Sequence, residues 1–313
     1  AAVAQQPDFI DAWSTLAALL KARARYDEAE ACCIAGLSVD AGHAGLKHLL
    51  ATIVFEQGRV DAAIAMAREA IALQPANASA HSDLLRMLNY ADAQNAAAVS
   101  REHRAWAQIH ERPLADAAQP HANVRDPARR LRIGYVSPYF RKHAVTFFLE
   151  PVIEHHNAAA LEIFLYADVT HPDEYSRRLQ FHGAIWRNSV DLTDEQLAAQ
   201  IRNDMIDILI DLSGQTPGHR LLAFARRPAP VQATWNGYPN TTGMSAIDYR
   251  ITDAYCDPPG ATEQLHAETL FRMPTTYMTW RIPDDAPPVA PLPALTNGHI
   301  TFGSFNSCYK LSA

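Results

Sequence analysis

The 313-residue sequence lacks the features of a disulfide framework, a membrane protein or a thiol metal site. It contains only four cysteines, too few and too irregularly spaced for a disulfide scaffold or a CxxC metal site, so we expect reduced thiols. These are Cys32, Cys33, Cys256 and Cys308. Its apolar stretches are the length of strands, far below the ~20 residues that a bilayer span needs, and no basic and apolar leader opens the chain. We therefore expect a cytoplasmic protein without a membrane partner.

Positive charge is also scarce. Lys and Arg number 27 against 34 Asp and Glu, which gives a formal net charge of −7 and argues against a nucleic-acid partner. Hydrophobic residues make up 48% of the chain, enough to bury a sizeable core. The length predicts two compact units joined by linkers rather than one domain.

Residues 1–112 are rich in alanine and repeat with a period of 34 residues. Leu16, Leu50 and Leu84 share this spacing, and Ala29 and Ala63 occupy the position where two paired helices would pack closely. Period and pattern resemble tetratricopeptide (TPR) repeats. Two units fit well and a third, degenerate unit follows, as a capping pair beside another domain should.

A polar, proline-punctuated linker over residues 113–130 precedes a region of alternating strands and helices, residues 131–282. Four apolar runs are predicted as strands: Leu131–Val136, Leu161–Ala167, Ile206–Leu212 and Pro230–Trp235. Three segments between or after them are predicted as helices: Thr146–His156, Thr193–Asn203 and Arg220–Arg226. Buried strands separated by helices predict a parallel sheet covered on both faces, that is, a Rossmann-like, doubly wound α/β domain after a helical solenoid.

Residues 283–297 contain five prolines and are predicted to form a stiff crossover. Residues 298–313 then begin like the first strand of another lobe.

Two polar loops follow the third and fourth predicted strands. The first contains Ser213, Gly214 and Thr216, and the second spans Asn236–Gly243. In an open parallel sheet, ligands bind beyond the carboxyl ends of the strands, and glycine lets the backbone approach them closely. Each loop by itself is more typical of an ordinary turn with capping residues. Two adjacent loops of this kind favour a site more than one does, but composition leaves both interpretations open.

Three motifs carry a resemblance to a known family. They are "LRIGYVSPYFRKHAV", "DILIDLSGQTPGHRLLAFARRPAPVQATWNGYPNTTGMSAIDYRITD" and "TFGSFNSCYKL". In this order, after TPR repeats, they resemble the O-linked N-acetylglucosaminyltransferases (O-GlcNAc transferases). The resemblance implies a GT-B architecture, in which residues 131–282 form the first lobe and residues 298–313 begin a second, UDP-binding lobe.

The resemblance also implies a reaction. The family transfers N-acetylglucosamine from UDP-GlcNAc to serine or threonine hydroxyls of proteins, with inversion and without a metal or other cofactor. The absence of a D-x-D pair agrees with metal independence. We expect the TPR groove to recruit protein or peptide acceptors, and these 313 residues alone to be inactive.

Two residues match the family's catalytic positions. His143, after the first strand, matches an active-site histidine, which could accept the acceptor's proton or orient the substrate. Ala144 and Val145 stand where the family usually has Pro-Thr. Lys310 matches a lysine that contacts the UDP diphosphate and stabilises the leaving group.

The other expected site residues lie in loops that the family uses for sugar, acceptor or nucleotide: Ser213, Gly214, Thr216, Gly237, Tyr238, Pro239, Thr241, Asn306, Ser307 and Tyr309. Ser213 replaces the family's asparagine and Ser307 its usual glutamine. The departures near His143 and at Ser213 keep one alternative open, a TPR peptide-binding scaffold with an inactive transferase-like domain. A second alternative is a related transferase on the same scaffold that uses another sugar nucleotide or glycosylates asparagine.

Overall fold

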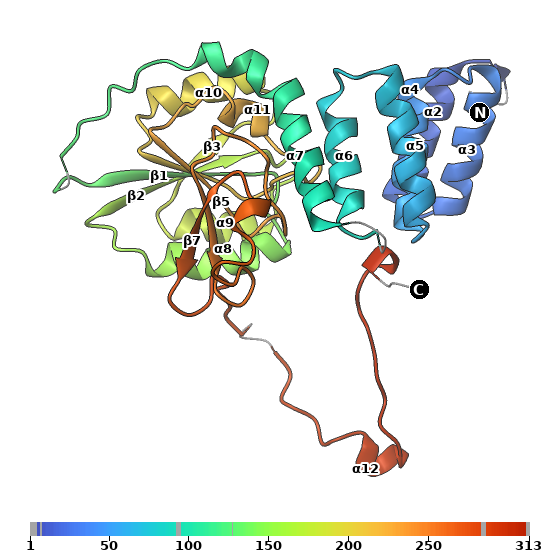
Figure 1. Ribbon diagram of the computed structural model, residues 1–313. Coiled ribbons are helices and arrows are strands. Elements are labelled where there is room, and N and C mark those ends of the chain that lie inside the picture. Colours follow the sequence, from blue (N-terminus) through green and yellow to red (C-terminus); the bar gives the residue numbers. More distant parts are fainter. Residues whose placement is uncertain (1–4, 7, 92–94, 127, 283–285, 311–313) are drawn as a thin grey trace.

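The computed structural model describes residues 5–6, 8–91, 95–126, 128–282 and 286–310 (Figure 1). It consists of three helical pairs, a seven-stranded sheet covered by helices, and a long C-terminal segment. The ends of three predicted segments, at 1–4, 283–285 and 311–313, lie outside the described residues.

The helical pairs follow the predicted period. They are α2 (Ile10–Ala22) with α3 (Tyr26–Val39), α4 (Ala44–Glu56) with α5 (Val60–Leu73), and α6 (Ala78–Leu88) with α7 (Ala96–His110). The first helices of the pairs begin 34 residues apart, and Ala29 and Ala63 are completely buried, as the close-packing prediction requires. Only α7 departs, beginning two residues later than the period predicts.

Short polar side chains fix where several helices begin. Asn77 accepts a hydrogen bond from the backbone N–H of Ala80 at the start of α6, and Asn95 accepts one from Ala97 at the start of α7. Each bond satisfies one of the N–H groups that a helix leaves unpaired in its first turn.

The sheet is parallel throughout. Its strands are β1 (Leu131–Ser137), β2 (Leu161–Ala167), β3 (Ile185–Asn188), β4 (Ile208–Asp211), β5 (Val231–Trp235), β6 (Tyr249–Asp253) and β7 (Thr269–Met273). Their order is β3-β2-β1-β4-β5-β6-β7, so the chain reverses direction across the sheet between β1 and β4. This order confirms the doubly wound α/β class.

Helices cover both faces of the sheet. In Figure 1, α8 (Ala144–His155) and α9 (Glu174–Phe181) lie below it, and α10 (Asp194–Asn203) and α11 (Leu221–Phe224) lie above it. Because side chains alternate along a strand, Val136 enters one hydrophobic cluster and Tyr135 the other. The cluster that contains Val136 continues through Trp106 of α7 into the helical pairs, so helices and sheet share one core.

The remaining elements are short. They are η1 (Arg112–Ala117), η2 (Glu263–Leu265), α12 (Ala294–Asn297) and η3 (Cys308–Lys310). The strand expected from residue 298 onward is wrong: residues 299–307 form no regular element. A strand needs a neighbour to pair with, and the described residues offer this segment none. Within the described residues, no helix is both long enough and apolar enough to cross a membrane.

Candidate functional site

A cavity of about 490 Å³ opens at the carboxyl edge of the sheet. Its walls come from the loops after β1, β2 and β4, which meet where the strand order reverses. It is lined by Pro138, Tyr139, Arg141, Asp168, Val169, Thr170, His171, Asp173 and Pro217. This is the position at which open α/β sheets bind ligands, and cationic, anionic and imidazole side chains all face it.

His143 borders this cavity through Tyr139. The two rings are stacked, with centroids 4.1 Å apart and planes inclined by 10°. The Tyr139 hydroxyl donates a hydrogen bond of 3.0 Å to the carbonyl oxygen of Pro217, the residue after Thr216. Tyr139 therefore links His143 to the loop after β4, a role that the sequence analysis missed although the residue stands four positions before His143.

The hydrogen bonds of His143 determine what its ring can do. His143 is the N-cap of α8, and its Nδ1 accepts a hydrogen bond of 3.2 Å from the backbone N–H of Val145. Burial, helped by the positive charge of Arg141, lowers the pKa of the imidazole below its ordinary value of 6.5. The ring is thus neutral at pH 7, and because Nδ1 is the acceptor, its proton is on Nε2. In this arrangement Nε2–H is available as a hydrogen-bond donor.

Arg220 holds Asp168, one of the residues that line the cavity. Its guanidinium lies 3.4 Å from the carboxylate of Asp168 and 2.6 Å from that of Asp194, and it also donates to two backbone carbonyls. Burial raises the pKa of Asp168, an effect that Arg220 opposes. Across the cavity, Asp173 accepts from the backbone N–H of Lys142 at 2.7 Å, which ties the loop after β1 to the start of α9.

Asp211 organises the loop that contains Ser213, Gly214 and Thr216. Its carboxylate accepts from the N–H groups of Ser213 and Gly214, at 3.0 and 2.8 Å, and from the Thr234 hydroxyl at 2.8 Å. Burial raises the pKa of Asp211 to about 6, against these hydrogen bonds. In the sequence, the only signal for this role is a carboxylate at the end of an apolar strand, just before a polar loop.

The predicted residues of this loop are unequally exposed. Ser213 is buried, and among the described residues its hydroxyl has no hydrogen-bond partner. Thr216 is half-buried and donates to the Ser213 carbonyl at 2.7 Å. Gly214 has φ of +51°, and a Cβ there would lie 2.3 Å from the Cβ of Tyr238, so any other residue would collide. Of the three, Thr216 is the one beside the cavity, since Pro217 lines it.

The loop after β5 faces the helical pairs with its largest side chain. Tyr238 is buried, and its hydroxyl lies 2.6 Å from the side-chain nitrogen of Asn89 and 2.8 Å from Nε2 of His103, both outside the sheet. Gly237 lies against the backbone just after β4, because a Cβ there would be 1.8 Å from the carbonyl oxygen of Leu212. The backbone of this loop therefore adjoins the loop after β4, while the Tyr238 ring points away from the cavity.

Two further residues of that loop, Pro239 and Thr241, differ in their exposure to solvent. Pro239 is exposed. Thr241 is completely buried and donates to the carboxylate of Glu268, which also accepts from Thr242. The geometry gives Thr241 a structural contact, and its expected contact with substrate stays a prediction.

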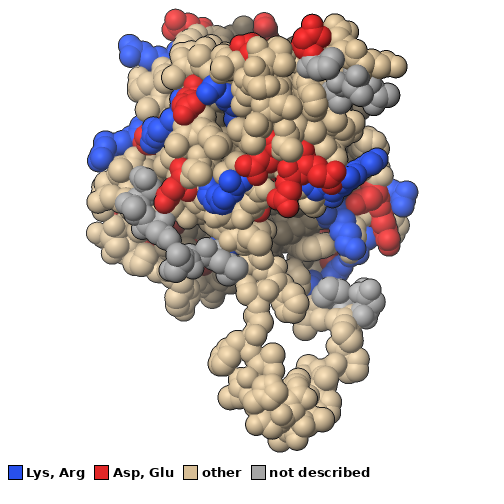
Figure 2. All heavy atoms as spheres, turned by 90° about the vertical axis from the view of Figure 1, so that its right-hand side faces the viewer, with Lys and Arg blue, Asp and Glu red and all other residues tan. Residues whose placement is uncertain are grey.

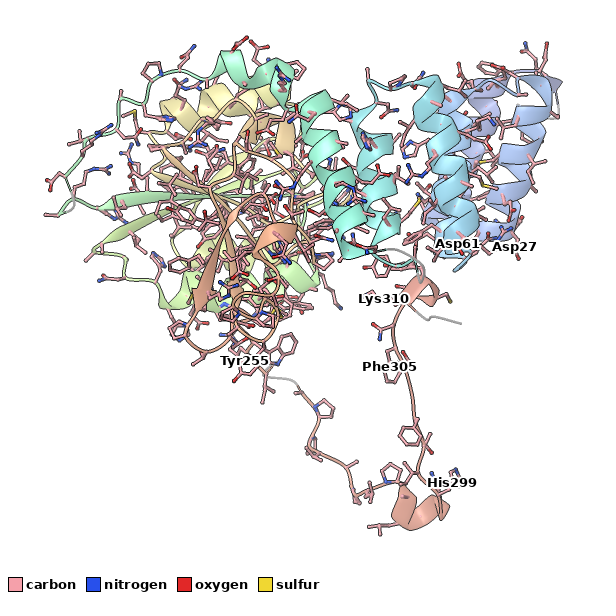
Figure 3. All side chains as sticks on the ribbon, in the orientation of Figure 1. Asp27, Asp61, Tyr255, His299, Phe305 and Lys310 are labelled. Atoms are coloured by element: carbon pink, nitrogen blue, oxygen red, sulfur yellow. The ribbon has the colours of Figure 1, made fainter. Side chains whose placement is uncertain are left out.

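The four C-terminal site residues lie elsewhere. Figure 3 shows Lys310 below the helical pairs, at the end of the segment that carries Phe305. Asn306 and Ser307 are exposed, and Tyr309 packs on Phe55 and Tyr90 of the helical pairs. The structure thus brings His143 and Thr216 together around Tyr139 and places Lys310 on η3, and the joint action of His143 and Lys310 stays a prediction.

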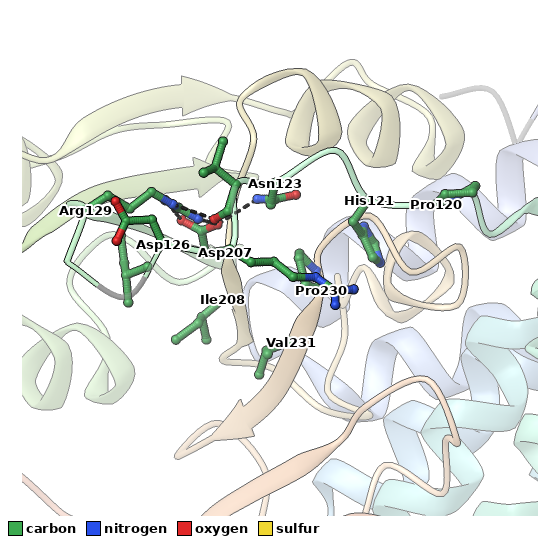
Figure 4. Close-up of a pocket in the computed structure, with 12 residues that line it drawn as sticks. Pro120, His121, Asn123, Asp126, Arg129, Asp207, Ile208, Pro230 and Val231 are labelled. Carbon is green, nitrogen blue, oxygen red and sulfur yellow. Dashed lines mark hydrogen bonds and ion pairs between the residues drawn. The ribbon is translucent and has the colours of Figure 1, made fainter.

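A larger cavity of about 620 Å³ lies at the opposite, amino edge of the sheet (Figure 4). The linker covers it with His121, Asn123 and Arg129, and its floor includes Ile208 and Val231. Asp207 there is neutralised by Arg129 and bonded by Asn123. None of the predicted site residues lines this cavity. Among the described residues, no group of three histidine, cysteine or acidic side chains could hold a metal ion.

Comparisons with a family model and with individual known proteins point to the same family. Residues 75–284 match glycosyl transferase family 41. A Petunia hybrida protein described as probable UDP-N-acetylglucosamine–peptide N-acetylglucosaminyltransferase SPINDLY is 38% identical over 244 residues, covering 77% of this chain and 26% of its own length. Its Arabidopsis thaliana counterpart is 37% identical with the same coverage. The chain thus spans about a quarter of these curated relatives.

A solved structure is similar along nearly the whole chain. It is a lysine-to-methionine mutant of the Thermobaculum terrenum O-GlcNAc transferase, with a TM-score of 0.93 and 37% sequence identity. The similarity covers 99% of this chain and 59% of that one.

Proposed function

The chain belongs to glycosyl transferase family 41, and from this premise we propose that it forms the acceptor-side part of an enzyme that transfers N-acetylglucosamine from UDP-GlcNAc to serine or threonine hydroxyls of proteins. The observation that carries the proposal is the polar cavity at the point of strand reversal, with His143 stacked on Tyr139 at its border. The names of the relatives, UDP-N-acetylglucosamine–peptide N-acetylglucosaminyltransferases, support the choice of donor and acceptor.

We assign His143 the role of orienting the acceptor. Its neutral ring presents Nε2–H, which can donate to the oxygen of an incoming hydroxyl and hold a lone pair toward the sugar. The same tautomer cannot accept a proton at Nε2, so the geometry favours orientation over general-base catalysis. Tyr139 keeps the imidazole in place by stacking, and α8 fixes it through the bond to Val145.

Inversion, metal independence and acceptor recruitment by the helical pairs belong to the same proposal. Without a metal, the departing diphosphate needs a protein cation, and Lys310 is our candidate. It is exposed and carries the only charge between residues 286 and 310.

The test uses the full-length gene product that carries this chain, radiolabelled UDP-GlcNAc and a mixture of serine- and threonine-containing acceptor peptides. We expect label transfer that persists in EDTA and is weak with UDP-glucose. His143→Ala should lower kcat/KM by about 10²-fold or more, while His143→Gln, whose amide can donate from a similar position, should recover part of the loss.

His155→Ala is the matched control, because His155 is an exposed histidine of the same helix α8. It should leave the rate unchanged. A folded full-length protein without label transfer would favour the inactive scaffold, transfer of another sugar would favour a related transferase, and a rate equal to wild type in His143→Ala would remove His143 from the site.

A further inference from the structure

The C-terminal segment is attached to the helical pairs through one aromatic side chain. Tyr309 stacks on Phe55 of α4, with ring centroids 4.4 Å apart and planes inclined by 24°, and meets Tyr90 edge-on at 4.9 Å. The guanidinium carbon of Arg86 lies 4.5 Å from the centre of the Phe55 ring. Phe55 is completely buried beneath these neighbours. Offset-stacked and edge-on rings are the arrangements that aromatic pairs prefer.

The attachment is selective. Within residues 299–310, Tyr309 is the only side chain that is not exposed, whereas Phe302 and Phe305 are 92% and 106% exposed. Figure 3 shows Phe305 on the segment below the helices and Lys310 close beneath them. Of the three aromatic residues within residues 302–309, only Tyr309 packs against the helical surface.

Charge does not explain the contact. Residues 286–309 contain no Asp, Glu, Lys or Arg, and Figure 2 shows the protruding segment without red or blue side chains. Among the described residues, the Tyr309 hydroxyl makes no hydrogen bond. The aromatic ring itself therefore carries the attachment.

The turn between α4 and α5 lies against the same segment. Gly58 has φ of +85°, and a Cβ built there would lie 3.4 Å from the Cβ of Cys308. This distance is close to the 3.5–4.5 Å that separates the Cβ atoms of a disulfide.

We propose that Phe55, Gly58 and Tyr90 form an aromatic receptor on the helical pairs that docks residues 308–310 and thereby positions Lys310. Through this receptor, the second and third helical pairs hold Lys310 in position. This role is separate from any recruitment of acceptors. The docking follows from the contacts alone, and its consequence for Lys310 rests on the proposed function.

Disulfide trapping tests the docking without any assay of activity. Gly58→Cys, oxidised under mild conditions, should cross-link to Cys308, and peptide mass spectrometry should find this pair as the main product. Gly42→Cys, in the exposed turn between α3 and α4, is the matched control and should give at least ten-fold less cross-link to Cys308. Equal cross-linking from both positions would overturn the docking.

A second measurement leaves Gly58 unchanged, since a cysteine at positive φ strains the turn. Chymotrypsin cleaves after phenylalanine and tyrosine, so Phe302, Phe305 and Tyr309 report on one segment in one digest. We expect cleavage after Tyr309 to be at least ten-fold slower than after Phe305, and Phe55→Ala to accelerate only the cleavage after Tyr309. Equal cleavage at all three sites in the wild-type protein would contradict the receptor.

The positioning role is tested in the full-length gene product. Tyr309→Ala should raise the KM for UDP-GlcNAc about ten-fold and leave the KM for the acceptor peptide unchanged, whereas Tyr309→Phe keeps the ring and should recover most of the loss in donor KM. An unchanged donor KM in Tyr309→Ala would refute the positioning of Lys310. A cross-linked protein that transfers no sugar at all would instead refute the proposed function and leave the docking intact.

Discussion

The first two helical pairs and the third pair are attached to their surroundings by different chemistry. The helices α2 to α5 carry mainly exposed ion pairs, such as Lys47 with Glu69 and Arg59 with Glu30. Figure 2 shows acidic and basic side chains interspersed on this end of the molecule. Solvent screens such pairs, and each contributes little to stability.

The third pair contacts the sheet region through buried hydrogen bonds. In Figure 1, α7 lies between α6 and the sheet. Ser82 donates to the Gln215 side chain at 2.7 Å, His103 and Asn89 share the Tyr238 hydroxyl, and Glu111 accepts from the backbone of residues 245 and 246. The match to the family also begins at residue 75, just before α6. The third pair therefore continues the 34-residue period of the repeats, but its buried contacts join it to the sheet region.

We call the contacts between the third helical pair and the sheet region the junction. The largest expected change in its stability comes from lowering the pH. Burial lowers the pKa of His81, His103 and His219 to about 4 each. The hydrogen bonds of His103 agree with a neutral ring, because its Nδ1 donates to the carbonyl of Val99 and its Nε2 then accepts from the Tyr238 hydroxyl. Above pH 6.5 these rings are neutral whether the chain is folded or not. Between pH 6.5 and 4 mainly the unfolded chain binds these protons. The free energy of unfolding therefore decreases as the pH is lowered from 6.5 to 4, and it changes little from these groups below pH 4.

One buried carboxyl opposes this trend. Asp211, with its pKa raised to about 6, binds a proton in the folded state first and stabilises the fold as the pH falls. Because one pKa unit is worth about 1.4 kcal/mol, three imidazoles outweigh one carboxyl, and the net loss by pH 4 is several kcal/mol. Urea titrations at pH 7, 5.5 and 4 measure it. Equal stability at all three would show that the junction is not buried as described.

The next largest effect is expected from Glu111→Ala. Glu111 is buried and accepts from the backbone N–H of Ala246 at 2.6 Å and from the N–H and hydroxyl of Ser245. Its removal leaves two N–H groups near the junction without a partner, for a loss of roughly 3–5 kcal/mol. Glu69→Ala on α5 is the matched control and should cost less than about 1 kcal/mol. Similar losses for both, in denaturant unfolding, would remove the distinction between the pairs.

Tyr238→Phe probes a single atom of the same junction. The change keeps the ring and removes the hydroxyl that Asn89 and His103 share, so two polar groups lose their partner. We expect a loss of about 1–3 kcal/mol. The variant should also weaken the pH dependence of His103, which a stability titration between pH 7 and 4 would reveal. An undiminished pH dependence would show that the hydroxyl does not determine the protonation of His103.

Local patterns in the sequence predicted the elements that such patterns determine. The 34-residue period placed the helices that begin at Ile10, Ala44 and Ala78, and continuous apolar runs placed β1, β2, β4 and β5. The strands β3, β6 and β7 and the helix α9 escaped notice. β3 has only four residues, and β7 is an edge strand whose residues alternate between exposed and half-buried. Both therefore lack the continuous apolar run that identifies a buried parallel strand.

The site was predicted less completely because it depends on contacts between distant residues. The motif gave His143, but not its stacking on Tyr139 or the tautomer that Val145 imposes. Nothing local to Tyr238 indicates that its hydroxyl meets His103, 135 positions earlier in the chain. Residue type and strand ends predict which loops form the edge of a sheet, while the direction of a side chain is fixed only by tertiary packing.

The smallest effect concerns the exposed pair of the second helical unit. Lys47 Nζ lies 2.6 Å from Glu69 Oε2, and the Glu69 side chain is 61% exposed. A double-mutant cycle with Lys47→Ala and Glu69→Ala should give a coupling of about 0.2–1 kcal/mol at low ionic strength. In 1 M salt, where screening extends over only ~3 Å, the coupling should vanish, whereas the loss caused by Glu111→Ala should persist because its partners are buried. A coupling at Lys47–Glu69 that resists salt would mean that this ion pair is shielded from solvent as the contacts of Glu111 are, and would remove the contrast between the two kinds of contact.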